Sequence, residues 1–322
     1  MPIINQSSYR HPGYLFNGHV QTIVPSMFRK IEGIRYQRER LELADGDFLD
    51  LDWLKQKAQK LVIISHGLEG NSERHYVTGM AKYFSARGWD ALAWNCRGCS
   101  GEMNRLPKFY HHGATEDLQA VVEHAVSTGS YSHVALVGIS MGGSLTLKYF
   151  GESGDALLKN VKCASVFSVP CHLGDSANEL DKPNKRFYLN RFLQKLSKKI
   201  EAKSKVFPNE ISHVGFEKIK TFREFDTRYT APLHGFKDAD DFYTRASSGA
   251  YIASIAKPVL IVNALNDPFL PQTCFPFDVA RTHASVGLET PATGGHVCFS
   301  VKGKQENWME VRAFEFIQQY IQ

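Results

Sequence analysis

Long apolar segments are missing from this chain of 322 residues. No run of about 18 apolar residues occurs, so we expect no helix that spans a membrane. The first ten residues also lack a basic start followed by an apolar stretch, which is the pattern of a secretory signal. From these absences we expect a cytoplasmic protein without a transmembrane segment.

Neither positive nor negative charge is in large excess in this sequence. The 38 basic and 33 acidic side chains leave a formal net charge of +5, and they are dispersed along the chain. A balance this mild does not indicate a nucleic-acid surface, and the sequence contains no DNA-binding or RNA-binding motif. We therefore expect no nucleic-acid partner.

Cysteines are few and scattered. The chain has six, and with 43% hydrophobic residues it can bury a core that needs no disulfide bonds. Cys96 and Cys99 have the spacing of a redox or zinc pair, but no second pair and no neighbouring His-x-His accompanies them. We expect reduced thiols, no metal and no cofactor.

The most informative stretch is residues 134–145, VALVGISMGGSL. Residues 134–137 are typical of a strand buried on both faces, and a helical pattern follows the glycines. Gly138 and Gly142 flank Ser140 in the Gly-x-Ser-x-Gly pattern of a nucleophile elbow, where the turn from strand to helix strains the serine backbone. A nucleotide-binding turn is disfavoured because no lysine directly follows the glycines. A tight turn without function is the remaining alternative.

Strand-like segments alternate with helix-like segments through most of the chain. We expect strands at residues 38–44, 48–54, 61–65, 89–95, 134–137, 163–169, 259–264 and 286–290. This alternation predicts an α/β domain with a mainly parallel, eight-stranded sheet flanked by helices.

A long insertion interrupts the alternation. About 90 residues separate the sixth expected strand from the seventh, where a short crossover would suffice. We therefore divide one domain of residues 1–322 into an amino-terminal arm (1–35), a core (36–169 and 255–322) and a helical cap (170–254).

Residues 186–200 of the expected cap predict an amphipathic helix. Its apolar face consists of Leu189, Phe192, Leu193, Leu196 and Ile200, and basic residues occupy the other face. We interpret it as a helix that covers the core with a solvated basic face. Weak contact with a membrane surface or with an anionic substrate is the alternative. Phe187 and Phe192 are our candidates for lining a substrate pocket.

A nucleophilic serine needs a base and a group that orients the base. In the order serine, acid, histidine, His296 fits the base because it lies in a glycine-flanked loop after the last strand. Asp267 fits the acid because it follows the strand 259–264, and Asp175 is the reserve candidate.

Two backbone amides are the candidates for an oxyanion hole. Met141 begins the helix after the elbow, and Leu68 follows the bend at His66 and Gly67 after the third strand. We expect His66 to orient this loop rather than to act as a base. His112 and Asp117 have a spacing that is sometimes linked to acyl transfer, although Asp117 also suits the first turn of a helix.

Several motifs together resemble the YheT-like branch of the α/β-hydrolase superfamily, which includes bacterial hydrolases and eukaryotic lipid esterases and acyltransferases. The matching stretches are residues 17–22, 45–53, 66–70, 97–102, 110–113, 138–143 and 294–297. The sequence departs from the pattern at Met141 and Ser144, where relatives often have Leu and Asn, and at Cys298, where Gly is common. The resemblance implies an α/β-hydrolase fold and esterase or lipase-like activity through Ser140, Asp267 and His296.

From the residues and the resemblance we expect a cofactor-independent serine hydrolase that cleaves a small-molecule or lipid ester through an acyl-enzyme. An acyltransferase that passes the same acyl group to an alcohol is one alternative. A catalytically silent receptor with this fold is another.

Overall fold

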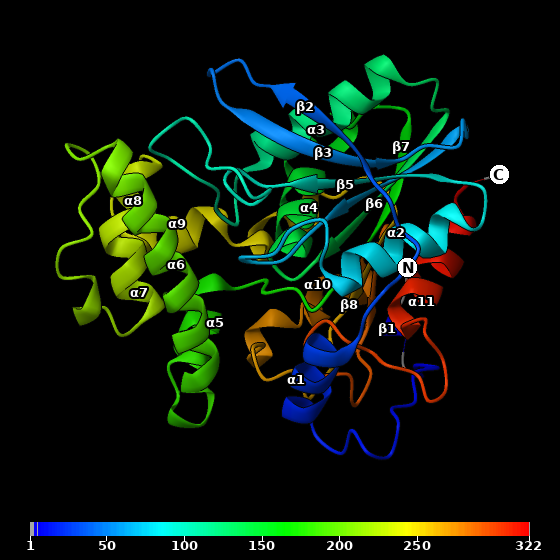
Figure 1. Ribbon diagram of the computed structural model, residues 1–322. Helices are drawn as coiled ribbons and strands as arrows, with labels where there is room; N and C mark the ends of the chain where they lie inside the picture. Colours follow the sequence, from blue (N-terminus) through cyan, green and yellow to red (C-terminus); the bar gives the residue numbers. More distant parts are fainter. Residues whose placement is uncertain (1–2, 5, 322) are drawn as a thin grey trace.

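A single mixed sheet forms the centre of the computed structural model, which describes residues 3–4 and 6–321 (Figure 1). In chain order the strands are β1 (Ile3–Ile4), β2 (Gln37–Glu42), β3 (Phe48–Leu54), β4 (Lys60–Ser65), β5 (Asp90–Asn95), β6 (His133–Ile139), β7 (Val161–Phe167), β8 (Val259–Val262) and β9 (Val286–Glu289). Their order across the sheet is β1-β9-β8-β7-β6-β4-β5-β3-β2. Among the described strands, β3 alone runs opposite to the rest of the sheet, so its pairings with β2 and with β5 are antiparallel.

The described residues form nine strands, so the expected count of eight was wrong by one. The additional strand is β1, which pairs in parallel with β9 inside the segment expected to be an arm. A strand of two residues is too short to show an alternation of apolar and polar side chains. Its pairing also depends on a partner strand far away in the sequence. Residues 1, 2 and 5 of the expected arm, and residue 322 of the expected core, lie outside the described residues.

Side chains of the central strands point alternately to two hydrophobic clusters, one on each face of the sheet. In β4, Leu61 and Ile63 belong to one cluster, whereas Val62 and Ile64 belong to the other. Because both faces are covered, these strands read as unbroken apolar runs in the sequence. The alternation of strands and helices therefore predicted the layered α/β architecture correctly.

Helices cover both faces of the sheet (Figure 1). Those outside the insertion are α1 (Gly18–Phe28), α2 (His75–Ser85), α3 (Thr115–Thr128), α4 (Met141–Ser153), α10 (Phe277–Thr282) and α11 (Trp308–Gln318). Side chains of α3 and α4 pack in the first cluster, and those of α2 and α11 pack in the second. None of the helices within the described part of the chain combines the length and apolar character needed to cross a membrane.

The segment assigned to a cap contains a group of helices beside the core (Figure 1). These are α5 (Leu173–Leu180), α6 (Arg186–Val206), α7 (Phe222–Phe225), a π-helical turn (Asp226–Thr230), α8 (Ala231–Leu233) and α9 (Ala239–Ala246). The segment leaves the sheet after β7 and returns before β8, as the gap between expected strands predicted.

Helix α6 is the longest helix of this group, and its basic face differs from our expectation. Leu189, Leu193 and Leu196 are buried, as the apolar pattern predicted. Lys199 is buried as well, so the prediction of a solvated basic face for residues 186–200 was wrong at this position, and Lys203, beyond that stretch, is also buried. Lys199 pairs with Glu69 of the core, with 2.8 Å between its Nζ and a carboxylate oxygen. Periodicity identifies the apolar face of a helix, but it does not tell which basic side chains meet a carboxylate from another segment.

Candidate active site

Ser140 lies at the sharp turn between β6 and α4. Its φ of 55° and ψ of −119° place it in a strained region for a residue with a side chain. The turn is tight because α4 begins against β4, where a Cβ atom on Gly142 would lie 2.2 Å from the carbonyl oxygen of Ser65. Only glycine fits there. The Gly-x-Ser-x-Gly pattern therefore reports a real steric constraint.

His296 and Asp267 lie in hydrogen-bonding reach of this serine. His296 Nε2 is 3.0 Å from Ser140 Oγ, and His296 Nδ1 is 2.8 Å from Asp267 Oδ2. Both His296 and Asp267 are buried, although they are 29 residues apart in the chain. The structure therefore brings together the three side chains that the sequence singled out.

The carboxylate of Asp267 is held in place from a second side. Its Oδ1 accepts a hydrogen bond of 2.8 Å from the amide of Phe269, whose ring stacks on His296 with 4.1 Å between centroids. The reserve candidate, Asp175, instead lies in α5 beside the exposed ring of His172, at 3.3 Å. The structure does not place Asp175 against His296.

Helix α1 positions the two loops that carry His296 and Asp267, which the sequence analysis did not foresee. Gln21 Oε1 accepts hydrogen bonds from the amide of Gly294 at 2.8 Å and from Asn266 Nδ2 at 2.9 Å. Thr22 Oγ1 accepts one from the amide of His296 at 2.9 Å. The only signal for these residues was that Gln21 and Thr22 fall in the family motif at 17–22.

The loop that follows β4 lies against the serine. A Cβ atom on Gly67 would be 3.2 Å from Ser140 Cβ, and Leu68 comes directly after it. Met141, the other candidate, is the first residue of α4. Amides at the first turn of a helix lack intrahelical partners, so the amide of Met141 is available to an anionic oxygen.

His66 holds this loop from inside the protein. Its Nε2 accepts a hydrogen bond of 3.1 Å from the amide of Cys96, so Nδ1 carries the proton and donates to Gly67 O at 2.8 Å. Burial lowers the pKa of His66 to about 4, which keeps the ring neutral. Both ring nitrogens are used, in agreement with an orienting role.

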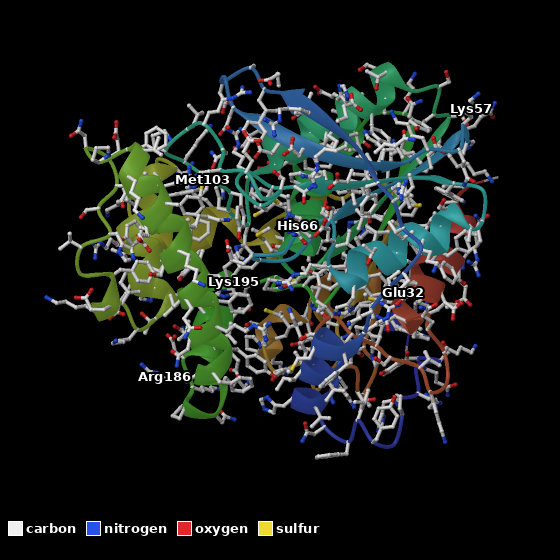
Figure 2. All side chains as sticks on the ribbon, viewed as in Figure 1. Glu32, Lys57, His66, Met103, Arg186 and Lys195 are labelled. Carbon is white, nitrogen blue, oxygen red and sulfur yellow. The ribbon has the colours of Figure 1, made fainter. Side chains whose placement is uncertain are left out.

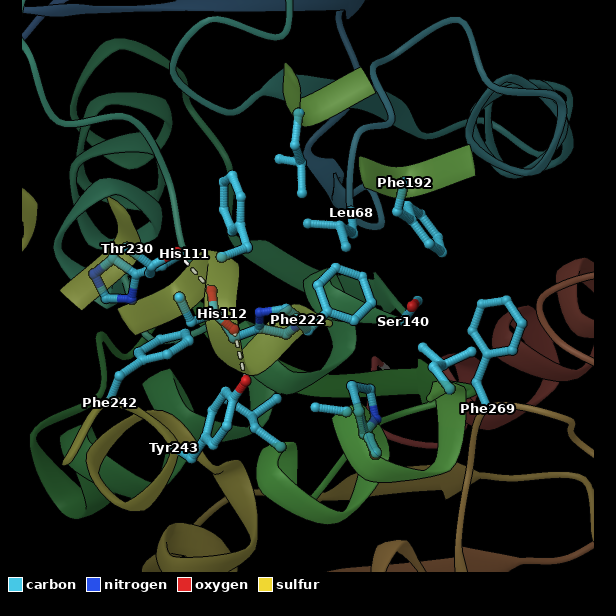
Figure 3. Close-up of a pocket in the computed structure, with 18 of the residues that line it drawn as sticks. Leu68, His111, His112, Ser140, Phe192, Phe222, Thr230, Phe242, Tyr243 and Phe269 are labelled. Carbon is cyan, nitrogen blue, oxygen red and sulfur yellow. Dashed lines mark hydrogen bonds between the residues drawn. The ribbon is translucent and has the colours of Figure 1, made fainter. Parts of the chain in front are cut away.

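An apolar pocket opens beside Ser140 and runs under the inserted helices (Figure 3). It has a volume of about 100 Å³. The inserted segment contributes apolar side chains to its wall, including Leu173, Leu180, Leu196, Phe222, Phe225 and Phe242. Phe192 and Phe269 lie near Ser140, whereas Thr230 and Tyr243 lie across the pocket from it (Figure 3).

Asp226 is a buried carboxylate in the wall of the apolar pocket. It accepts hydrogen bonds from Thr230 Oγ1 at 2.6 Å and from the Tyr243 hydroxyl at 2.8 Å. Burial raises the pKa of Asp226 to about 6, because these two neutral donors do not offset the loss of water.

A second pocket, of about 320 Å³, lies on another side of the serine. We call it the basic pocket because Arg74, Arg191 and Lys195 line it. It shares five residues with the apolar pocket, namely Leu68, Ser140, Phe192, Phe269 and His296. Of the two candidate pocket residues, Phe192 therefore lines both cavities. Phe187, which is 47% exposed, lines the basic pocket and not the apolar one.

The spacing of His112 and Asp117 has a structural explanation. Asp117 is buried and accepts hydrogen bonds from Arg97 Nη2 at 2.6 Å and from Arg97 Nε at 2.9 Å. Arg97 also pairs with Asp47, at 3.0 Å. Asp117 thus belongs to a buried ion-pair network, and the structure offers no reason to assign it to acyl transfer.

Comparison with known proteins shows the family to which the chain is similar. Residues 56–228 match the family model described as "Serine aminopeptidase, S33" among the hydrolases. The chain is 32% identical to "Putative esterase YheT" of Escherichia coli, covering 95% of this chain and 92% of that protein. It is 27% identical to "Phospholipase ABHD3" of Homo sapiens, covering 100% of this chain and 81% of that protein.

Among solved structures, the Pyrococcus furiosus esterase Pf2001 has a similar fold, with a TM-score of 0.60. The match covers 91% of this chain and 99% of that one at 17% identity. At this level of identity the likeness bears on the fold alone, and it shows the architecture that the sequence predicted.

The raised pKa of Asp226 predicts a pH-dependent stability. The folded state favours the protonated carboxyl of Asp226. The stability that this group contributes is therefore complete below the ordinary pKa of 3.8 and is lost as the pH rises through about 6. Between about pH 4 and pH 7, we expect the free energy of unfolding of the wild type to fall on the order of 2 kcal/mol more than that of Asp226→Asn. Urea denaturation at each pH measures the difference.

The matched control is Asp240→Asn, which changes an aspartate side chain that is 75% exposed in the same group of helices. This variant should retain the wild-type dependence on pH. Parallel pH curves for the wild type and Asp226→Asn would contradict the prediction.

Proposed function

The chain belongs to the α/β-hydrolase family, in the branch of the Escherichia coli protein YheT, and we propose that it is a serine hydrolase of carboxylic esters. One observation carries this proposal. Ser140, His296 and Asp267 form a continuous hydrogen-bonded series, with distances of 3.0 and 2.8 Å, at a strained turn from strand to helix. This arrangement suits a serine nucleophile, its base and the group that orients the base.

In the proposed reaction, Ser140 Oγ attacks the ester carbonyl while His296 Nε2 takes the hydroxyl proton. Asp267 stabilises the imidazolium through its 2.8 Å contact with Nδ1. The amides of Leu68 and Met141 donate to the oxyanion. His296 then gives the proton to the leaving alcohol. In the second half of the reaction, His296 Nε2 takes a proton from water as the water oxygen attacks the acyl carbonyl, and it returns this proton to Ser140 Oγ as the bond between Ser140 and the acyl group breaks.

The apolar pocket supports an acyl chain as the part of the substrate that enters beneath the inserted helices. Its wall is mainly aliphatic and aromatic, which suits a hydrocarbon. The human relative is named a phospholipase, which supports a lipid ester as the substrate class. An acyltransferase would use the same acyl-enzyme, and measuring how the acyl group divides between water and an added alcohol separates the two activities.

Replacing the nucleophile tests the proposed mechanism. Ser140→Ala should lower ester turnover by ~10³-fold or more and abolish labelling by a fluorophosphonate probe, because no other group supplies the attacking oxygen. Kinetics with a chromogenic short-chain ester and in-gel detection of the probe measure both effects.

Ser144→Ala is the matched control, since Ser144 lies in the first half of the same helix, α4, and its buried hydroxyl has no hydrogen-bond partner among the described residues. It should keep both labelling and turnover. Near-native turnover in Ser140→Ala would refute the serine mechanism.

The acid assignment gives a separate prediction. Asp267→Asn should lower kcat by a factor on the order of 10⁴, because the amide no longer fixes the tautomer of His296 or stabilises its charged form. Asp175→Asn should have little effect, since Asp175 contacts His172 instead. Steady-state kinetics of the two variants test this, and a larger loss in Asp175→Asn would mean that the acid has been misassigned.

Phe192 should influence the preference for acyl chain length. Its ring lies at the junction of the two pockets, so Phe192→Ala widens the entrance to the apolar pocket. We expect the ratio of kcat/KM for medium-chain and short-chain esters to change by roughly tenfold, or about 1.4 kcal/mol.

Phe187→Ala provides the comparison, because Phe187 lines only the basic pocket and should shift the chain-length ratio less. If Phe192→Ala left the ratio unchanged and only lowered the melting temperature, the ring would have a packing role alone.

A further inference from the structure

Three basic side chains surround the basic pocket from two different parts of the chain. Arg74 precedes α2, and Arg191 and Lys195 lie one turn apart on α6. No aspartate or glutamate is among the residues that line the pocket. Within the described part of the chain, none of the three cations forms an ion pair with a carboxylate, unlike Lys199 on the same helix.

Two of these cations converge on one atom. Lys195 Nζ lies 3.1 Å and Arg74 Nη2 lies 3.3 Å from the backbone carbonyl oxygen of Glu69, so the two charged groups are near neighbours. Lys195 lies on the side of α6 that faces the core (Figure 2). Burial lowers the pKa of Lys195, and repulsion by Arg74 and Arg191 lowers it further, although the charge of Glu69 acts in the opposite direction.

The carboxylate of Glu69 offsets the positive charge of this cluster only in part. The side chain of Glu69 is engaged by Lys199 at 2.8 Å and by the Tyr110 hydroxyl at 2.6 Å. A backbone carbonyl carries only a partial charge, so Arg74 and Lys195 keep an excess of positive charge in a half-buried place. An anion bound between them would relieve the repulsion and form charge-assisted hydrogen bonds.

The position of the cluster relates it to the reaction. Glu69 directly follows Leu68, and both pockets reach Ser140 and His296. An ester carbonyl held at Ser140 therefore has its two substituents near two different cavities. The apolar pocket lacks any lysine or arginine and suits the acyl chain, which leaves the basic pocket for the alcohol part.

We propose that the basic pocket binds an anionic group, such as a phosphate or a carboxylate, on the alcohol part of the ester. This inference rests on the proposed ester hydrolysis and adds a specificity to it. Arg74, Arg191 and Lys195 select the substrate through the charge of its leaving alcohol, while the apolar pocket selects the acyl chain.

The test compares two soluble esters with the same acyl group, 1-butyryl-glycerol 3-phosphate and 1-butyryl-glycerol. The wild type should have the higher kcat/KM for the phosphate ester. Arg191→Gln and Lys195→Gln should each lower the ratio of the two kcat/KM values about tenfold, which corresponds to about 1.4 kcal/mol. Added salt should lower the wild-type ratio in the same direction.

Lys198→Gln is the matched control, because Lys198 is an exposed lysine of α6 that does not line the basic pocket. It should leave the ratio at the wild-type value. A general loss of folding in any variant would lower both kcat/KM values together, so the ratio isolates the effect of the anion.

Three results would overturn the inference. One is a wild-type ratio near one, or a ratio that the two variants do not change. Another is that a negative charge on the acyl part raises kcat/KM as much as one on the alcohol part, measured by comparing the ethyl monoester of butanedioic acid with ethyl butyrate. The third is loss of binding to phosphatidylserine vesicles in the variants with no effect on the soluble esters, which would assign the cluster to a membrane surface.

A binding measurement separates this inference from the proposed function. Ser140→Ala cannot turn over the esters, but calorimetry should show that it binds the phosphate ester more tightly than the neutral one. If the wild type hydrolyses neither ester, the proposed function fails while the binding result still tests the basic pocket. If it hydrolyses both equally through Ser140, the proposed function stands and the anion site is refuted.

Discussion

The site depends on the close contact between the start of α4 and the end of β4. This contact leaves no room for a side chain at Gly142, and it forces Ser140 into a positive φ of 55°. Such a conformation costs on the order of 1–3 kcal/mol and persists only where the surroundings hold it. Here the amide of Ser140 donates to Phe167 O at 2.8 Å, and Ser140 O accepts from the amides of Gly143 and Ser144. The strain is thus balanced by bonds within the sheet and α4.

A fixed serine requires partners that are equally well fixed, and these come from loops that have no regular structure of their own. The loops of Asp267 and His296 are joined by Asn266, whose Oδ1 accepts a hydrogen bond of 3.0 Å from the amide of Gly295. Both loops are then held by Gln21 and Thr22 of α1. The amino-terminal segment therefore acts as a brace for the site. The hydrogen bonds are made by the side chains of Gln21 and Thr22, so they require these residue types at these positions. The motif at residues 17–22 therefore reflects specific contacts rather than a helical periodicity.

The sequence predicts those parts of the site that depend on local geometry. Gly138 and Gly142 reveal the elbow because the turn excludes other residues, and Asp267 and His296 can be found because each follows a strand that ends at the same edge of the sheet. Contacts between distant segments leave no such pattern. The pairing of Ile3–Ile4 with β9 could not be predicted, and neither could the brace formed by α1. Likewise, no periodicity indicated that Phe192 would line both pockets whereas Phe187 would line only the basic one.

Helix α6 connects these separate parts. Its Lys199 pairs with the carboxylate of Glu69, and its Lys195 donates to the backbone carbonyl of the same residue. Burial raises the pKa of the Glu69 carboxyl. The positive charge of Lys199, together with the hydrogen bonds that Glu69 accepts from Lys199 and Tyr110, outweighs burial and keeps the pKa of Glu69 below the usual range of a glutamate. A buried ion pair of this kind adds little net stability, but it fixes the relative position of the groups that it joins. Because Glu69 directly follows Leu68, these contacts fix the position of α6 relative to the loop that carries the proposed oxyanion donor. The segment that shapes both pockets therefore also sets the position of an amide proposed to act in the chemistry.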